Sequence, residues 1–349
     1  MPSQTSSALQ TVLDNTVDGK QVFGTSFAVR QDTFNWQGAA GNLTICQPYF
    51  ITSTTKLFTT ALVLQLQAAG KLHLDDPISA YLDTGITRGL HRYRGKDYAP
   101  TLTLTHLLAH TSGLPDYFQG QNAHGQSLEN ALTTGHDQGW TFEQAIERSK
   151  SMPPLFAPGT PGKAHYSDTN FQLLGKIIAT LSGQSYAENC RDRIIQPLGM
   201  NQTYLYQNPS DTTPKSLYYH SRKLSIPLAM SSFGADGGMV STTGDMLVFL
   251  EAFFRGKLFP ASDIDALQTW NRIFFPLRSG IGLHLFKLPW ILNPTASVPY
   301  FIGHSGLSGA LAFYSPQAQI FITGTVNQAA RPDLAFKTMI RLTRQILNK

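Results

Sequence analysis

The spacing of apolar and polar residues predicts a helix and then two strands at the start of the chain. Residues 7–17 place apolar side chains at helical intervals, so we expect an amphipathic helix there. Two stretches rich in aromatic and β-branched residues follow at 22–30 and 33–39, and each is expected to form a strand. The Gln31-Asp32 pair lies between them and is a suitable turn.

A longer helix is predicted to begin near Ser53. Gly70 suits the position just beyond its C-terminal end. Its apolar stripe consists of Leu57, Ala61, Leu64 and Ala68. Another helix is expected over residues 169–182, where Gly183 gives the stop signal. The apolar face of that helix contains Phe171, Leu174, Ile178 and Leu181.

The C-terminal part of the chain has the pattern of two strands and a final helix. Residues 309–314 and 319–326 are expected to be strands joined by Ser315-Pro316-Gln317. The helix should start after Pro332. Its predicted buried side consists of Phe336, Ile340, Thr343 and Leu347.

The order of these elements predicts an α+β fold. Strands occur near both ends of the chain, and the long middle is mainly helical, so one antiparallel sheet flanked by the N- and C-terminal helices explains the order. We expect a single domain over residues 1–349. Its sheet region would cover about 1–56 and 232–349, and its inserted helical region about 57–231.

Composition is that of a folded globular protein. The chain has 349 residues, 42% of them hydrophobic and only 14% charged, which excludes extensive disorder. The net charge of +5 is small and scattered. The densest basic stretch, at 91–96, is expected to be a solvated loop, so we expect no nucleic-acid partner. Cys46 and Cys190 show no metal-ligand spacing; a disulfide is conceivable, but two unpaired buried thiols are favoured.

The sequence offers no membrane-spanning or export signal. No apolar run has the length of a transmembrane helix, and the N-terminal residues MPSQTSSALQ lack a basic start and an apolar core. As written, the chain is expected to be cytoplasmic; if a leader has been removed, it would be periplasmic or secreted. The oligomeric state is left open.

Ser53 and Lys56 form the pattern Ser-x-x-Lys. On a helix the two side chains share a face, so the lysine amine can reach the serine hydroxyl. Serine is a weak nucleophile until a base removes its proton, and a desolvated lysine can do so. The pattern alone is weak, because an ordinary N-cap serine followed by a surface lysine gives the same spacing.

Further motifs make the pattern specific. Tyr166-Ser167-Asp168 precedes a predicted helix, and His304-Ser305-Gly306 precedes a predicted strand. In order and spacing they resemble the Tyr-x-Asn and Lys-Thr-Gly elements of the serine β-lactamase and penicillin-binding-protein superfamily. The resemblance extends over nearly the whole chain and is closest to the branch of class C β-lactamases, D-alanyl-D-alanine carboxypeptidases and family VIII esterases. Supporting segments are Asp75-Asp76-Pro77, His110-Thr111-Ser112-Gly113-Leu114, Pro197-Leu198-Gly199-Met200 and Gly237-Gly238-Met239-Val240.

The resemblance implies a serine hydrolase that works through an acyl-enzyme. Ser53 would attack a carbonyl, while Lys56 and Tyr166 would share the proton handling. The N–H groups of Ser53 and Leu307 would form the oxyanion hole. Substrate contacts would come from the neighbouring residues Asp168, His304, Ser305, Gly306 and Leu307. The partner would be a small ester, amide or peptide, such as a D-amino-acid peptide. No metal or other cofactor is expected.

Two positions depart from the family pattern. Asp168 occupies the place of the family's Asn; a carboxylate accepts hydrogen bonds only, and beside Lys56 it should favour the charged ammonium. We therefore expect a direct Asp168–Lys56 contact and a larger role for Tyr166 in removing the proton. His304 replaces the family's Lys, and a neutral imidazole holds a carboxylate less well. Both departures make efficient β-lactam turnover less favoured than turnover of esters or D-amino-acid amides.

Other interpretations of the sequence are less well supported. The segment around His304 lacks the last Gly of Gly-x-Ser-x-Gly, and no His follows it, which excludes an α/β-hydrolase elbow. His106 and His110 are four residues apart, but Leu107 replaces the Glu of a zinc-protease motif, so structural roles are favoured. The alternatives kept for the whole protein are a β-lactamase and a non-catalytic penicillin-binding sensor. Retention of Ser53, Lys56 and Tyr166 favours an enzyme over a sensor.

Two segments, 116–139 and 201–231, are expected to wall the pocket. Their aromatic residues either line a site for an apolar acyl or aryl group or merely pack the loops, and the sequence does not choose between these. The residues concerned are Tyr117, Phe118, Tyr204, Tyr206, Tyr218 and Tyr219.

Overall fold

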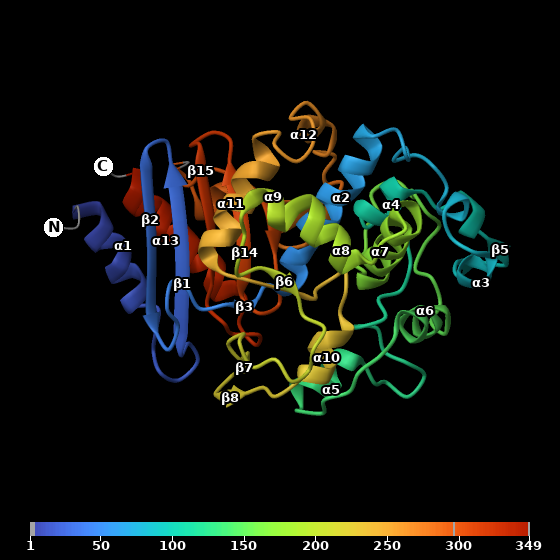
Figure 1. The fold of residues 1–349 in the computed structure, drawn as a ribbon, viewed down its shortest axis with the longest axis horizontal. Coiled ribbons are helices and arrows are strands. Elements are labelled where there is room, and N and C mark those ends of the chain that lie inside the picture. Colours follow the sequence, from blue (N-terminus) through green and yellow to red (C-terminus); the bar gives the residue numbers. More distant parts are fainter. Residues whose placement is uncertain (1–3, 296, 348–349) are drawn as a thin grey trace.

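A large antiparallel sheet forms the scaffold of the computed structural model, which describes residues 4–295 and 297–347 (Figure 1). Among these residues, eight strands belong to this sheet, and all neighbours in it run antiparallel. In spatial order they are β10 (Asn271–Phe274), β11 (Leu277–Ser279), β12 (His284–Phe286), β13 (Phe301–Ser305), β14 (Ala310–Ser315), β15 (Ile320–Thr325), β1 (Gly24–Gln31) and β2 (Phe34–Gly41). The predicted α+β class is confirmed.

The sheet joins the two ends of the chain through the pairing of β1 with β15. Successive side chains of a strand point to opposite faces. Accordingly Phe27 and Val29 of β1 belong to the apolar cluster under the terminal helices, whereas Ala28 between them belongs to the cluster on the other face. Burial on both faces explains why β14 and β15 are almost continuously apolar.

The terminal helices α1 (Gln4–Asp14) and α13 (Asp333–Leu347) pack against each other on one side of the sheet, at one end of the molecule (Figure 1). Helix α1 begins three residues earlier than predicted. In α13 the predicted buried row is confirmed only at Thr343, because the sequence carries two adjacent apolar rows. Phe336 and Ile340 only flank the core, and Leu347 is 39% exposed. The fully buried row consists of Ala335, Met339, Leu342 and Ile346.

The opposite face carries α2 (Lys56–Ala68), α7 (Asp168–Ser182) and α11 (Thr243–Phe254), which share the largest apolar cluster. Helix α2 is buried on every side from Lys56 to Leu64, so the single stripe expected from the sequence understated its burial; Ala68, a predicted stripe residue, is exposed. In α2, Phe58 stacks on Phe249 of α11, with ring centroids 3.9 Å apart. A helix enclosed in this way holds Lys56 at a definite place.

Short elements connect the scaffold and wall the site. The remaining helices are α3 (Thr84–Thr87), α4 (Leu104–Leu108), α5 (Leu128–Thr133), α6 (Phe142–Lys150), α8 (Tyr186–Cys190), α9 (Gln196–Leu198), α10 (Pro227–Ser232) and α12 (Asp263–Ala266). A small sheet contains β3 (Tyr49–Phe50), β9 (Met239–Ser241) and β6 (Tyr204–Leu205), and two hairpins contain β4 (Arg92–Tyr93) with β5 (Lys96–Asp97) and β7 (Tyr218–Tyr219) with β8 (Arg222–Lys223). The division of the chain into a sheet region and an inserted helical region stays a prediction.

Neither cysteine is in a disulfide, and only Cys190 is buried; Cys46 is exposed, unlike the expectation. Across the described residues, no helix is both long and apolar enough to cross a bilayer.

Replacing Phe58 by Ala should lower the free energy of unfolding by about 3–5 kcal/mol, because it empties a fully buried site and removes a ring stack. Denaturant unfolding of the variant measures the loss. The matched control is Phe275→Ala, since Phe275 is 77% exposed and its removal should change stability by less than about 0.5 kcal/mol. Equal losses in the two variants would contradict the assigned core.

Candidate active site

Ser53 lies at a sharp turn between β3 and α2. The turn residue Thr52 has a left-handed backbone with φ of +43°, an unusual conformation for a β-branched residue. Its hydroxyl lies 3.1 Å from that of Ser308, which in turn donates to the carbonyl of Phe50. The predicted helix start is corrected slightly: Ser53 belongs to a 3₁₀ turn, and the α-helix begins at Lys56. Ser53 is thereby half-buried and lines a cavity.

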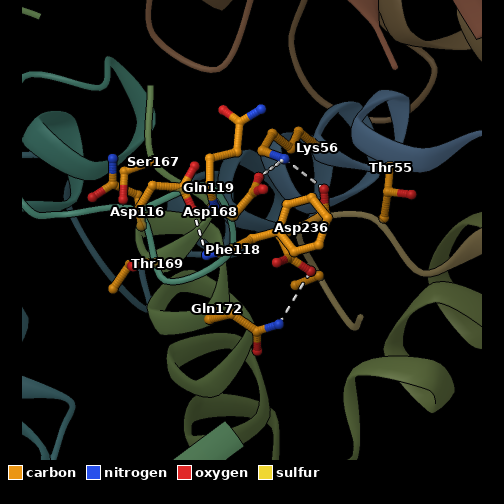
Figure 2. Close-up of polar contacts among 12 residues, drawn as sticks. Thr55, Lys56, Asp116, Phe118, Gln119, Ser167, Asp168, Thr169, Gln172 and Asp236 are labelled. Atoms are coloured by element: carbon orange, nitrogen blue, oxygen red, sulfur yellow. Dashed lines mark hydrogen bonds and ion pairs between the residues drawn. The ribbon is translucent and has the colours of Figure 1, made fainter. Parts of the chain in front are cut away.

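The Lys56 ammonium is completely buried, and two acceptors bind it. Asp168 Oδ1 lies 2.5 Å from Nζ, and the main-chain oxygen of Asp236 is equally close (Figure 2). The Asp168–Lys56 contact expected from the sequence is therefore present. Of the three N–H donors of an ammonium, two are engaged in this way. The same nitrogen lies 4.9 Å from the ring centroid of Tyr166.

Two further acids surround this ion pair (Figure 2). Burial, followed by repulsion from Asp168, raises the pKa of Asp236 to about 7, and Lys56 partly offsets the rise. The Asp236 carboxyl accepts from Tyr117 Oη at 2.7 Å and from Gln172 Nε2 at 3.1 Å. Burial and Asp168 likewise raise the pKa of Asp116 well above its usual value. One cation thus lies among three carboxyl groups, of which Asp168 alone bonds to it through its side chain.

Tyr166 lies directly beside the nucleophile. Burial, followed by the nearby Asp168 carboxylate, raises the pKa of its phenol well above 10, and a contact with Ser53 lowers it in part. The phenol is therefore protonated at neutral pH. No well-formed hydrogen bond satisfies its hydroxyl within the described residues. Its ring stacks on His110, with centroids 4.5 Å apart, and the residue lines the cavity.

His304 occupies the predicted position in the chain, but its side chain is 1% exposed and does not line the cavity in the described structure. Its Nδ1 lies 2.8 Å from the Ser305 carbonyl, and its ring stacks on His284 with centroids 3.9 Å apart. Burial, His284 and Lys56 together lower the pKa of His304 well below 6.5. His284, which the sequence did not single out, lines the cavity in its place.

The loop after β13 lies against the nucleophile. Ser305, Gly306 and Leu307 all line the cavity. A Cβ on Gly306 would lie 2.1 Å from Thr52 Oγ1 and 3.2 Å from the Ser53 nitrogen, so only glycine permits this approach. The close approach is between Gly306 and the Thr52–Ser53 turn, and the oxyanion hole expected from the N–H groups of Ser53 and Leu307 stays a prediction.

The cavity has a volume of about 320 Å³ and a mainly apolar lining. Both predicted wall segments contribute, but Phe118 is the only one of the six expected aromatic residues that faces it in the described structure. Tyr117 instead bonds to Asp236, and Tyr206 packs on Phe50. The apolar wall is mostly aliphatic on this side, with Leu132, Leu217, Leu224, Ile226 and Met230, and it is aromatic on the other, with Phe274 and Phe275.

The sequence analysis did not identify Asp116, Asp236 and His284 as site residues. Each comes from a segment outside the recognised motifs. A polar residue inside an apolar run was the only available signal for His284, and Asp236 directly precedes the Gly237-Gly238 segment. The histidines weighed as zinc ligands have structural contacts: His106 Nδ1 accepts from Thr103 N, and His110 Nδ1 accepts from Ser167 N. Within the described part of the chain, no group of three His, Cys, Asp or Glu side chains could hold a metal ion.

Known proteins resemble this chain over most of its length. The sequence matches the family described as Beta-lactamase over residues 8–343. The D-alanyl-D-alanine-carboxypeptidase/endopeptidase AmpH of Escherichia coli (strain K12) is 28% identical over 301 residues, which cover 83% of this chain and 72% of the relative.

Solved structures of hydrolases also resemble this chain. A D-stereospecific amidohydrolase from Streptomyces sp. has a TM-score of 0.77 at 27% identity, over 95% of this chain and 97% of the other. A D-amino acid amidase from Ochrobactrum anthropi SV3 has a TM-score of 0.81 over 99% of both chains; at 23% identity this likeness concerns the fold alone. The named relative and neighbours are hydrolases.

Replacing Asp168 by Asn should move the alkaline limb of the pH–rate profile to lower pH and speed acylation by a β-lactam. The reason is that the ammonium loses its ionic partner in this variant, so Lys56 gains a route that it lacks in the parent, direct acceptance of the Ser53 proton. Rates of labelling by a fluorescent penicillin across pH measure both effects. Asp236→Asn is the matched control, because Asp236 contacts Lys56 through its main chain. If the Asp168→Asn variant keeps the parental pH–rate profile and labelling rate, the Lys56–Asp168 ion pair has no role in proton transfer.

Asp236→Asn should stabilise the protein more at pH 8 than at pH 5. The raised pKa of Asp236 means that the folded state holds a proton that the unfolded state releases near pH 4, so folding stability falls as the pH rises from about 4 to 7. Asn resembles the protonated carboxyl and removes this contribution. Denaturant unfolding of parent and variant at the two pH values tests the prediction, and a stability difference independent of pH would contradict it.

Proposed function

This chain belongs to the Beta-lactamase family, and from that premise we propose that it is a serine hydrolase that cleaves an ester or amide through an acyl-enzyme on Ser53. The resemblance indicated by the Ser-x-x-Lys pattern and the later motifs is thereby confirmed at the level of the superfamily. The observation that carries the proposal is the buried Lys56–Asp168 pair beneath Tyr166, at the edge of a cavity that Ser53 lines. A sensor without chemistry has no need of a desolvated cation next to a serine.

In the proposed acylation step, Ser53 Oγ attacks the substrate carbonyl carbon, and the electron pair of the C=O bond moves to oxygen. The N–H groups of Ser53 and Leu307 stabilise the oxyanion. Tyr166 acts as a relay: its oxygen takes the Ser53 proton while its own proton passes to the leaving nitrogen or oxygen. This relay requires a phenol that has its own proton to give away. Burial keeps Tyr166 in that form, and a permanent phenolate would have no proton to pass on.

Lys56 has an electrostatic role in this scheme. Its ammonium lies under the Tyr166 ring and remains bound to Asp168, so it stabilises the negative charge that develops on the oxygens during proton transfer. Deacylation runs in reverse order: water attacks the acyl carbon, passes a proton through Tyr166, and Ser53 leaves with its hydroxyl restored. Atoms and charge balance over the two steps.

Short-chain esters and D-amino-acid amides should be hydrolysed with a higher kcat/KM than cephalosporins. The physical reason is that Asp168 can only accept hydrogen bonds from a substrate, and it keeps the Lys56 ammonium occupied. Parallel kinetics on p-nitrophenyl esters, D-amino-acid amides and nitrocefin test this. A nitrocefin kcat/KM above that of every ester and amide would show that the role given to Asp168 is wrong.

The same assays include Ser53→Ala as the control for the mechanism. Loss of the nucleophile should reduce hydrolysis by several powers of ten. Wild-type protein should also react with a fluorophosphonate probe, and the variant should not. Substantial hydrolysis by folded Ser53→Ala, or no labelling of the wild type, would refute an acyl-enzyme on Ser53.

A further inference from the structure

His284 is a buried polar side chain whose ring nitrogens lack hydrogen-bond partners in the described part of the chain. Its imidazole is 2% exposed and lines the cavity from β12. Among the described residues neither Nδ1 nor Nε2 makes a hydrogen bond. Buried polar groups in folded proteins are nearly always paired, so an unpaired one facing a cavity indicates a ligand that supplies the missing bonds.

The position of His284 assigns it to one side of the substrate. The Tyr166 ring lies 6.1 Å from that of His284 and 5.9 Å from that of Phe274, centroid to centroid, so Tyr166 belongs to the wall formed by β10 and β12. The aliphatic wall comes from Leu132 and from residues 217–230, and it packs in a separate apolar cluster. Because Tyr166 passes its proton to the leaving group in the proposed reaction, the leaving group departs along the wall that contains His284.

The charges around the cavity restrict the kind of leaving group that the wall containing His284 can hold. Of the lining residues in the described structure, none is Lys or Arg, whereas Glu129, Asp168, Asp236 and Asp333 are acidic. The cations near them already have acidic partners: Lys56 is fully buried and bound to Asp168, and Arg331 and Lys337 pair with Asp333. Burial and the charge of Lys56 lower the pKa of His284 to about 3, so the imidazole is neutral at physiological pH. A carboxylate placed beside His284 would lose its water without meeting an unpaired cation.

We propose that His284 forms a hydrogen-bonding subsite for an uncharged leaving group and that the enzyme discriminates against leaving groups that carry a carboxylate. A neutral imidazole offers one donor and one acceptor, which match a carboxamide or a hydroxyl group. Its stack on His304 fixes the ring plane, so the two nitrogens keep their direction. This inference rests on the proposed Ser53 hydrolase.

The test compares two substrates that share the acyl group and the scissile bond: N-acetyl-D-Ala-D-Ala and N-acetyl-D-Ala-D-alaninamide. The amide form should have a kcat/KM at least about tenfold higher, because its leaving group brings no charge into the cavity. Equal values, or a preference for the carboxylate form, would overturn the proposal. Fluorophosphonate labelling of the same sample distinguishes failure of the leaving-group preference from failure of the proposed hydrolase. If the wild-type protein is not labelled, the Ser53 hydrolase is refuted. If it is labelled, the ratio of the two kcat/KM values decides the leaving-group preference.

Two variants test His284 itself. His284→Phe keeps a ring and removes both nitrogens, so its kcat/KM for the alaninamide substrate should fall about five- to tenfold. His284→Gln retains a donor and an acceptor and should recover most of that loss. A labelled His284→Phe variant with parental activity on the alaninamide would contradict the assigned subsite, and so would a His284→Gln variant that recovers none of the loss.

Discussion

The burial of one positive charge governs the arrangement of this site. Removing an ammonium from water costs several kcal/mol even in a relaxed protein, so the charge is tolerated only where partners surround it. Asp168 comes from the start of α7, and the Asp236 carbonyl comes from the segment before β9. Lys56 can therefore be buried only when three distant parts of the chain meet. Helix α2, which is buried on every side from Lys56 to Leu64, fixes the point at which they do so.

The acids follow from the same constraint. A single cation can compensate one carboxylate fully, and Asp168 is the one bonded to it. Asp236 and Asp116 are also buried within the field of Asp168, so their pKa values rise and both favour the protonated form. Their hydrogen-bond partners, Tyr117 and the backbone of Phe118, keep them in place without a second cation. The raised pKa values thus reduce the negative charge that the three carboxyl groups would otherwise carry.

The sequence predicted what depends on local spacing and left out what depends on tertiary contacts. Ser53 and Lys56 share a helical turn, and the class of fold follows from the order of strands and helices. The Asp168–Lys56 contact was predictable too, because a carboxylate at that place has an obvious cation. Asp236 and His284 were missed because no motif contains them. For His304 the position in the chain was right, but a motif does not reveal that the side chain stacks behind another histidine instead of facing substrate.

The histidines show how far the influence of the buried cation extends. Burial is the main reason why the pKa values of His110, His284 and His304 are low, and the charge of Lys56 contributes to each. A second positive charge in this region would face both the lost hydration and the repulsion of the first. In a site that buries its lysine so completely, the neighbouring ring nitrogens are therefore confined to neutral hydrogen bonding. The position that carries a lysine in the related motif can accept a histidine here because an uncharged ring is the form that the surroundings stabilise.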